Sequence, residues 1–273
     1  MPESPPKILI AGCGYVGRAV AEIFHRQGWD VEGWTASHEA DAPYKIRAVD
    51  FTKPVVADDF DVVIQCASTR GGNADEYRRV YLQGARCLTS AFPKALFVFT
   101  SSTSVYAQTD GEWVTEESAA EPPRETGRIL RETEELILSH GGIVARLAGI
   151  YGPQRSALLE KFLSGRASVT DRFVNQIHRD DIATALQLLI TQKARGIYNV
   201  SDHHPMVQRE CYAWLAAHLQ KPLFLEMEEP RARKRGESNK RVSSAALQNL
   251  GWSPRYPTFQ AAMTDSILPS FGL

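Results

Sequence analysis

The 273-residue sequence is poor in several features that would mark a specialised class of protein. It has few cysteines, and these are widely scattered, with none of the paired spacing of a metal site or a disulfide framework. They are Cys13, Cys66, Cys87 and Cys211. We therefore expect reduced thiols and no bound metal. Formal charges nearly cancel, with a net value of −1, which disfavours a general attraction to nucleic acid or to a membrane.

Long hydrophobic runs are also absent. No apolar stretch approaches the roughly 20 residues of a membrane-spanning helix. The first six residues carry a glutamate and three prolines instead of a basic start and an apolar core. These features predict a cytoplasmic protein with no membrane partner. We find no internal repeat, and the chain is long enough for one large domain with a smaller lobe attached.

What the sequence does have is an alternation of short apolar runs with helical patterns over its first 150 residues. Helical periodicity appears at 15–28, at 74–92 and at 125–139. The apolar runs predict strands at 7–12, 29–34, 45–51, 61–68, 95–102 and 142–150. Repeated strand and helix units of this kind predict an α/β fold with a doubly wound parallel sheet, the Rossmann arrangement.

The segment "GCGYVG" lies between the first strand and the first helix. Its three glycines let the turn form and let a pyrophosphate approach the backbone, where amides at the start of the helix stabilise its charge. The same glycines would suit a plain tight turn, but the flanking strand and helix favour dinucleotide binding. The predicted contacts are Gly12, Gly14, Tyr15, Val16 and Gly17.

The stretch after the second strand bears on the choice between NAD and NADP. In NAD-binding proteins an acid at this place accepts the ribose hydroxyls, and residues 34–38 contain none. Hydroxyls such as those of Thr35 and Ser37 accommodate a 2′-phosphate, so NADP is favoured, although no arginine clamps the site and NAD stays possible. Asp50 and Phe51, which end the third strand, are placed to meet the adenine.

Beyond residue 152 the alternation loosens. Helices are predicted near 155–164, 180–192, 206–219 and 242–250, joined by loops rich in proline, glycine and charge. We expect residues 1–152 to form the NAD(P)-binding core. Residues 153–273 then mostly form a small C-terminal substrate lobe, with the segment at about 177–200 returning to the core.

Seven motifs in order resemble the extended short-chain dehydrogenase/reductase family of NAD(P)-dependent epimerases, dehydratases and reductases. They are "GCGYVG", "VIQCAS", "TSSTSVY", "RLAGIYGP", "IHRDDIATAL", "IYNVSD" and "NKRVSSAALQNLGW". The chain is most similar to the shorter, atypical epimerase/dehydratase-like branch. The resemblance implies cofactor contacts from Cys66, Ala67 and Ser68, a small-molecule substrate, and a homodimer formed through the helices after the fourth and fifth strands.

The resemblance breaks at the catalytic residues. In the family, a serine works with a tyrosine and a lysine four residues apart, and the lysine lowers a phenol pKa that otherwise lies near ~10. Here the serine matches Ser102, but the tyrosine position is Thr126 and the lysine position is Leu130. A threonine hydroxyl titrates too high to act as an acid at neutral pH. The acidic pair of the dehydratases falls on Thr103 and Ser104, so a dehydratase is disfavoured.

Four other side chains are candidates for the roles of proton donor and substrate ligand. Tyr106 and Tyr151 follow strands at the carboxyl edge of the sheet, so either is a candidate proton donor. His178 titrates in the right range and is a candidate substrate ligand, although it also suits the entry to a helix. Ser102 either holds the substrate oxygen or is a satisfied hydroxyl at a strand end.

The basic segment 231–241 allows three interpretations: a solvated loop, a nucleic-acid patch or a clamp for a phosphorylated substrate. Aromatic partners and a wider basic field are missing, which disfavours nucleic acid. The resemblance implies that Arg241 contacts a substrate diphosphate. The leading hypothesis is an NADP-dependent epimerase or reductase for a small carbonyl or sugar-like substrate, including a nucleotide-linked one. The alternative is a non-enzymatic protein that senses the redox state of the cofactor.

Overall fold

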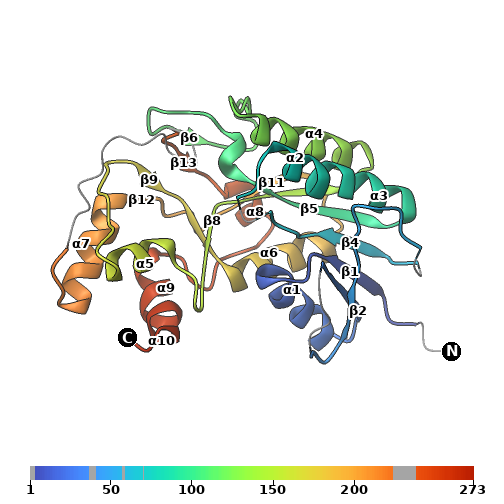
Figure 1. Cartoon of the computed structure of the whole chain (residues 1–273), viewed down its shortest axis with the longest axis horizontal. Coiled ribbons are helices and arrows are strands. Elements are labelled where there is room, and N and C mark those ends of the chain that lie inside the picture. Colours follow the sequence, from blue (N-terminus) through green and yellow to red (C-terminus); the bar gives the residue numbers. More distant parts are fainter. Residues whose placement is uncertain (1–3, 37–40, 57–58, 70, 224–237) are drawn as a thin grey trace.

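The computed structural model describes residues 4–36, 41–56, 59–69, 71–223 and 238–273. Its centre is a seven-stranded sheet in the order β11-β7-β5-β4-β1-β2-β3, with every pair of neighbours parallel (Figure 1). The strands are β1 (Lys7–Ala11), β2 (Asp30–Thr35), β3 (Lys45–Ala48), β4 (Val62–Gln65), β5 (Leu96–Ser102), β7 (Ile143–Leu147) and β11 (Gly196–Val200). The predicted doubly wound parallel sheet is confirmed.

The strands are apolar on both faces because helices cover both. In β1, Ile8 and Ile10 face one core cluster, whereas Leu9 and Ala11 face the other, as the two-residue period of a strand requires. Helices α1 (Tyr15–Arg26) and α6 (Arg179–Thr191) cover the first face. The other face carries α2 (Ala74–Tyr77), η1 (Arg78–Gln83), α3 (Gly84–Ala91) and α4 (Glu125–Ser139) (Figure 1).

The helix predicted at 74–92 is therefore a run of three segments, of which η1 is π-helical. The helix predicted at 125–139 has those bounds in α4. Strand order reverses beside β1, since β2 and β3 lie on one side of it and β4 on the other. Ligands of open α/β sheets bind at such a reversal, beyond the carboxyl ends of the strands.

The C-terminal part has a core of its own, built around residues such as Tyr151, Phe162, Tyr212 and Phe259. Its elements are β8 (Gly149–Tyr151), α5 (Ala157–Leu163), β9 (Phe173–Val174), β10 (Gln176–His178), β12 (Met206–Val207), α7 (Gln208–Leu219), α9 (Phe259–Ala262), η3 (Met263–Ile267) and α10 (Leu268–Ser270). The last three were not predicted.

Short elements connect this part to the sheet. They are η2 (Thr103–Val105), β6 (Trp113–Val114), β13 (Arg241–Val242) and α8 (Ala245–Asn249), and β13 pairs with β6. Within the residues that the structure describes, no helix combines the length and the apolar character needed to span a bilayer.

Candidate functional site

The glycine loop between β1 and α1 is shaped by contacts that exclude side chains at two positions. Gly12 has a φ of +102°, and a Cβ there would lie 2.2 Å from the Ala67 backbone nitrogen. A Cβ at Gly17 would lie 2.5 Å from the carbonyl oxygen of Gly12. In contrast, a Cβ at Gly14 would meet no described atom within 4 Å. The loop is therefore closely packed at Gly12 and Gly17 and open at Gly14.

The open side of this loop is suited to an anion. Among the described residues, no side chain caps the N-terminus of α1, so none of them supplies a side-chain acceptor to its first-turn amides. The N–H groups of Gly12 and Cys13 donate to the Trp34 carbonyl at 3.0 and 2.8 Å, which holds the loop against the end of β2. Amides at a helix start stabilise a diphosphate. The residues present thus fit a dinucleotide, with Val16 buried behind them.

The Tyr15 side chain is directed toward the C-terminal part of the chain. Its hydroxyl donates to the Pro153 carbonyl at 2.9 Å, and a Cβ at Gly152 would lie 2.6 Å from that hydroxyl. The guanidinium carbons of Arg155 and Arg179 lie 5.1 and 5.0 Å from the centroid of the Tyr15 ring. The backbone amide of Tyr15 is therefore the part that lies at the loop, while its ring lies between the loop and two cationic side chains of the C-terminal part.

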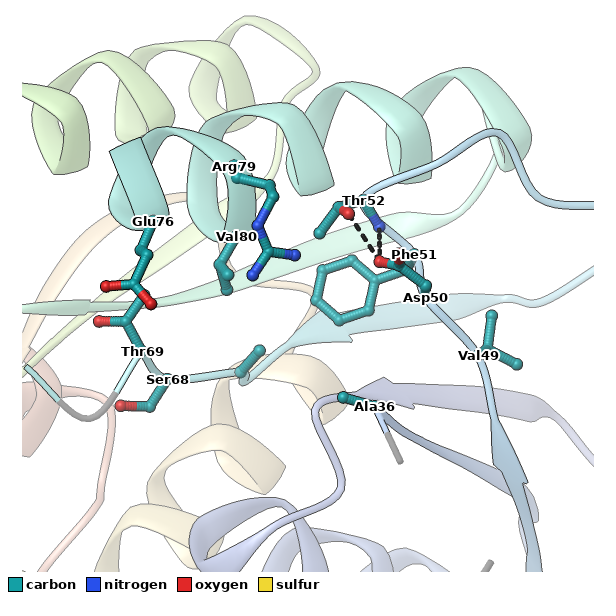
Figure 2. A pocket seen from close by; sticks show the side chains of 11 residues that line it. Ala36, Val49, Asp50, Phe51, Thr52, Ser68, Thr69, Glu76, Arg79 and Val80 are labelled. Carbon is teal, nitrogen blue, oxygen red and sulfur yellow. Dashed lines mark hydrogen bonds between the residues drawn. The ribbon is translucent and has the colours of Figure 1, made fainter. Parts of the chain in front are cut away.

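A pocket of about 280 Å³ opens over the carboxyl ends of β2, β3 and β4 (Figure 2). Both residues that the sequence placed at the adenine, Asp50 and Phe51, line it, as do Ala67 and Ser68. The other lining residues are Ala36, Val49, Thr52, Thr69, Glu76, Arg79 and Val80. Ala67, which lines the pocket, packs against Gly12 of the glycine loop, so the pocket and the loop are neighbours at the reversal of strand order.

The polar groups of this pocket differ in whether they already form hydrogen bonds within the protein. The Asp50 carboxylate accepts the N–H and the hydroxyl of Thr52 at 3.2 and 2.6 Å, and the Thr52 hydroxyl lowers the pKa of Asp50. Figure 2 shows the Arg79 guanidinium directed into the pocket from η1, between Val80 and Phe51. Sequence reasoning did not find Arg79, since nothing in "EYRRVY" separates it from the arginine before it.

The remaining predicted cofactor residues lie around this site. Thr35 ends β2, and its carbonyl accepts the Val49 N–H at 2.8 Å. Ser37 lies outside the described residues. Cys66 follows β4, and burial raises its pKa to about 12, so the thiol stays protonated. Within the described chain, no group of three or more His, Cys, Asp or Glu could hold a metal ion.

Ser102 lies at the carboxyl end of β5, at the start of η2. Its Oγ accepts the Ser104 N–H at 3.1 Å, which leaves the hydroxyl hydrogen for another acceptor. In α4, Leu130 is 4% exposed and belongs to the core cluster between the helices and the sheet, and Thr126 lies one turn earlier. At Leu130 the helix after β5 therefore contributes to the packed core.

Tyr106 is part of a buried hydrogen-bond network. Its hydroxyl accepts from Arg146 Nη1 at 2.8 Å and donates to Asn199 Oδ1 at 2.9 Å, and the side chain is 1% exposed. Burial raises its pKa, although Arg146 opposes that shift. Arg146 also donates to Glu134 at 2.7 Å, and Glu134 accepts the Ser101 hydroxyl at 2.5 Å. The network ties β5, β7, β11 and α4 together.

Tyr151 is equally buried but lacks such partners. Its hydroxyl has no hydrogen-bond partner among the described residues, and burial raises its pKa well above 10. It lies in the core of the C-terminal part with Tyr212, whose hydroxyl is also without a partner there. This geometry points the Tyr151 hydroxyl into packed side chains.

His178 caps α6. Its Nδ1 accepts the Asp180 N–H at 3.2 Å, so Nε2 carries the hydrogen and donates it to Ser266 Oγ at 3.0 Å. The ring lies 4.0 Å from the Tyr256 ring, between centroids, and burial lowers the pKa of His178 to about 4. Both ring nitrogens are therefore used within the fold, and the imidazole is neutral at physiological pH.

The basic segment ends in two residues with different surroundings. Arg241 donates from Nε to the Gly111 carbonyl at 2.7 Å and lies over the rings of Trp113 and Phe173. Lys240 is 7% exposed, and its Nζ donates to the Tyr106 carbonyl at 2.9 Å. Burial lowers the pKa of Lys240 to about 8. A charge-rich run gave no sign that one of its lysines would be buried beside Tyr106.

Residues 8–201 match the model of the NAD-dependent epimerase/dehydratase family. Protein YeeZ of Escherichia coli K12 is 28% identical over 279 residues, which cover 92% of this chain and 96% of YeeZ.

Solved structures are similar over almost the whole chain. A Methylobacillus flagellatus protein assigned to the NAD-dependent epimerases/dehydratases is 26% identical, with a TM-score of 0.81, over 99% of this chain and 100% of that one. A dTDP-glucose 4,6-dehydratase from Bacillus anthracis, solved with NAD, has a TM-score of 0.80 at 14% identity over 98% and 96% of the two chains. That second likeness is one of fold alone.

Proposed function

Because the chain belongs to the NAD-dependent epimerase/dehydratase family, we propose that it binds NADP and acts as an epimerase or reductase on a small carbonyl or sugar-like substrate. The observation that carries this proposal is that the glycine loop, open at Gly14, lies next to the pocket at Asp50 and Phe51. A diphosphate against the α1 amides would place the adenosine half in that pocket.

In this proposal each part of the chain has a role. The bound dinucleotide supplies hydride transfer. The first-turn amides of α1 hold the diphosphate, and the pocket orients the adenosine. Ser102, whose hydroxyl hydrogen is left for another acceptor, donates to the substrate oxygen at the end of β5. Tyr106 and His178 support the site as parts of the packed scaffold, and Arg241 holds the β6–β13 pair beside it.

A second candidate function is a cofactor-binding sensor that does no chemistry. The observation in its favour is that the candidate proton donors are turned inward: the Tyr106 hydroxyl is bonded to Arg146 and Asn199, and the Tyr151 hydroxyl lies among packed side chains. A protein that binds NADPH without turnover of any carbonyl would be such a sensor.

The test combines binding with turnover. At a concentration 100 times its Kd, a dinucleotide that binds only the native state adds about 2.7 kcal/mol to the unfolding free energy. At roughly 2–4 °C per kcal/mol, the melting temperature then rises by about 5–10 °C. NADPH oxidation over a panel of carbonyl compounds is measured in parallel. No shift with either NADP or NAD contradicts the whole proposal.

Ser102→Ala separates the two functions. In an enzyme, loss of this hydroxyl lowers the turnover number by about 10²-fold or more and leaves the dinucleotide-induced melting shift unchanged. The matched control is Ser104→Ala, which removes an exposed neighbouring hydroxyl and keeps the N–H that Ser102 accepts. Binding without turnover by the parent protein supports the sensor instead.

A further inference from the structure

Two consecutive arginines begin η1, and their surroundings differ. The Arg78 guanidinium lies 3.5 Å from the carboxylates of Glu125 and Glu132 on α4, away from the pocket. Arg79 instead lines the pocket, with its guanidinium directed inward (Figure 2). Among residues 4–36, 41–56, 59–69, 71–223 and 238–273, no ion pair includes Arg79. One arginine is neutralised and the other is not.

The acidic residues of the pocket are engaged elsewhere. Asp50 accepts two hydrogen bonds from Thr52 and lies 3.6 Å from the Lys53 ammonium. Glu76 accepts the Asn73 N–H at 2.9 Å in the capping box at the start of α2. Each carboxylate is therefore hydrogen-bonded to residues close to it in the sequence, and the positive charge of Arg79 remains available to a ligand.

The chemistry of the guanidinium identifies the class of group it would take. Arginine stays charged at any physiological pH and presents a planar fork that matches two oxygens of a phosphate. The pocket lies over the ends of β2, β3 and β4, which is the adenosine side of the glycine loop. On that side, the group that distinguishes NADP from NAD is the phosphate on the 2′ oxygen of the ribose.

We propose that Arg79 binds the 2′-phosphate of NADP and determines the preference for NADP over NAD. This inference rests on the proposed function, in which the pocket holds the adenosine half of the cofactor. It assigns the phosphate contact to a helix on the far side of the pocket from β2, where sequence reasoning placed Thr35 and Ser37. The competing role for Arg79 is stacking on the adenine, which both cofactors share.

The experiment uses fragments that differ only in the phosphate. Dissociation constants of adenosine 2′,5′-bisphosphate and of 5′-AMP are measured by calorimetry on the full chain, for the parent, Arg79→Ala, Arg79→Lys and Arg78→Ala. Arg79→Ala is expected to weaken the bisphosphate by about 10- to 100-fold, because a charge-assisted, bidentate contact is lost. AMP binding stays within about 2-fold, because that fragment lacks the phosphate that Arg79 contacts.

The other two variants serve as controls for charge and for position. Arg79→Lys keeps the charge but not the fork, so its affinity for the bisphosphate falls between those of the parent and Arg79→Ala. Arg78→Ala changes a neighbouring arginine outside the pocket and leaves the ratio of the two dissociation constants at the parent value. The melting temperature of each variant, measured without ligand, shows that it is folded.

The possible failures can be told apart. If Arg79→Ala leaves the ratio unchanged, or weakens AMP as much as the bisphosphate, Arg79 does not read the 2′-phosphate and the inference is wrong. A parent that binds both fragments equally overturns the inference and leaves dinucleotide binding intact. If the parent binds neither fragment and neither dinucleotide, the proposed function is wrong and the inference fails with it.

Discussion

At the residue scale, the polar groups of the candidate site differ in whether the fold already uses their hydrogen-bonding atoms. Both nitrogens of His178 and both hydrogen-bonding directions of the Tyr106 hydroxyl have partners inside the protein. The Ser102 hydroxyl accepts one bond and keeps its hydrogen. Residue type and position in the sequence made all three candidates for ligand contact. Their hydrogen-bond partners in the fold distinguish Ser102 from the other two, because a donor that is already bonded must give up that bond before it can bind a substrate.

The glycine at position 12 allows a direct test of the loop geometry. Gly12→Ala places a Cβ 2.2 Å from the Ala67 backbone nitrogen at a positive φ, so we expect a loss of about 2–5 kcal/mol in unfolding free energy. The control is Gly28→Ala, which has a φ of +82° and meets nothing within 4 Å. It should lose only about 1–2 kcal/mol. Urea denaturation of both variants provides the measurement, and equal losses would show that the Ala67 contact is unimportant.

Tyr106→Phe tests the interpretation that this tyrosine is structural. The change leaves an N–H of Arg146 and the side-chain oxygen Oδ1 of Asn199 without their buried partner. We therefore expect the unfolding free energy to fall by about 1–3 kcal/mol. Tyr212→Phe is the control, because that tyrosine is also buried and its hydroxyl has no partner among the described residues. We expect dinucleotide binding to be retained in both variants. A Tyr106→Phe protein with parental stability but no turnover would make Tyr106 a proton donor after all.

At the scale of the elements, α4 is held to the sheet by an ion pair as well as by its apolar face. Glu134 is fully buried and contacts Arg146 of β7, Ser101 of β5 and Arg131 of its own helix. Glu134 and the packed Leu130 thus hold α4 over β5 together.

Glu134→Gln removes one partner of the buried pair and leaves the Arg146 charge uncompensated. We expect a loss of about 3–5 kcal/mol in unfolding free energy, because a buried unpaired charge is costly. The neighbouring Glu135 is 66% exposed and forms an exposed ion pair with Arg131, so Glu135→Gln should change stability by less than about 0.5 kcal/mol. Denaturation at one pH compares the two. A small effect at position 134 would mean that packing alone holds α4.

At the scale of the whole molecule, the sheet and the C-terminal part meet around buried carboxyl groups. Asp202 follows β11, is 2% exposed and accepts the His204 N–H at 3.1 Å. Burial, with a smaller effect of Asp181, raises the pKa of Asp202 to about 8. Burial also raises the pKa of Asp181 to about 6, although its carboxylate accepts backbone N–H groups from Arg255 and Tyr256.

The sign of the pH effect follows from the raised pKa. Between the unfolded pKa of Asp202 and the folded value of about 8, the native state binds a proton that the unfolded state has lost. The contribution of Asp202 to stability is therefore present at low pH and is lost as the pH rises toward 8. The unfolding free energy of Asp202→Asn should rise relative to that of the parent by on the order of 1 kcal/mol for each pH unit over this window. Asp30→Asn, an exposed carboxylate, is the control. A constant difference between Asp202→Asn and the parent from pH 5 to pH 8 would contradict the prediction.

Local sequence was enough for the elements of the core. The apolar runs of β1, β4 and β7 identified buried parallel strands, and α4 has the predicted bounds. The helix at 74–92 was predicted in place but not its π-helical middle, because an apolar pattern this short does not show where a single extra residue is inserted. That turn changes which side chains face the crevice, so the pocket position of Arg79 was beyond sequence reasoning.

The sequence by itself determined the order of strands and helices and the position of the glycine loop, because apolar period and glycine spacing act over a few neighbouring residues. Only the tertiary structure decided which polar groups face the site. Tyr106, Glu134, Arg146 and Asn199 come from four separate segments and use one another's hydrogen bonds. Burial and partner choice depend on chain segments that meet only in the fold, so no local pattern distinguishes such a residue from one that remains available to a ligand.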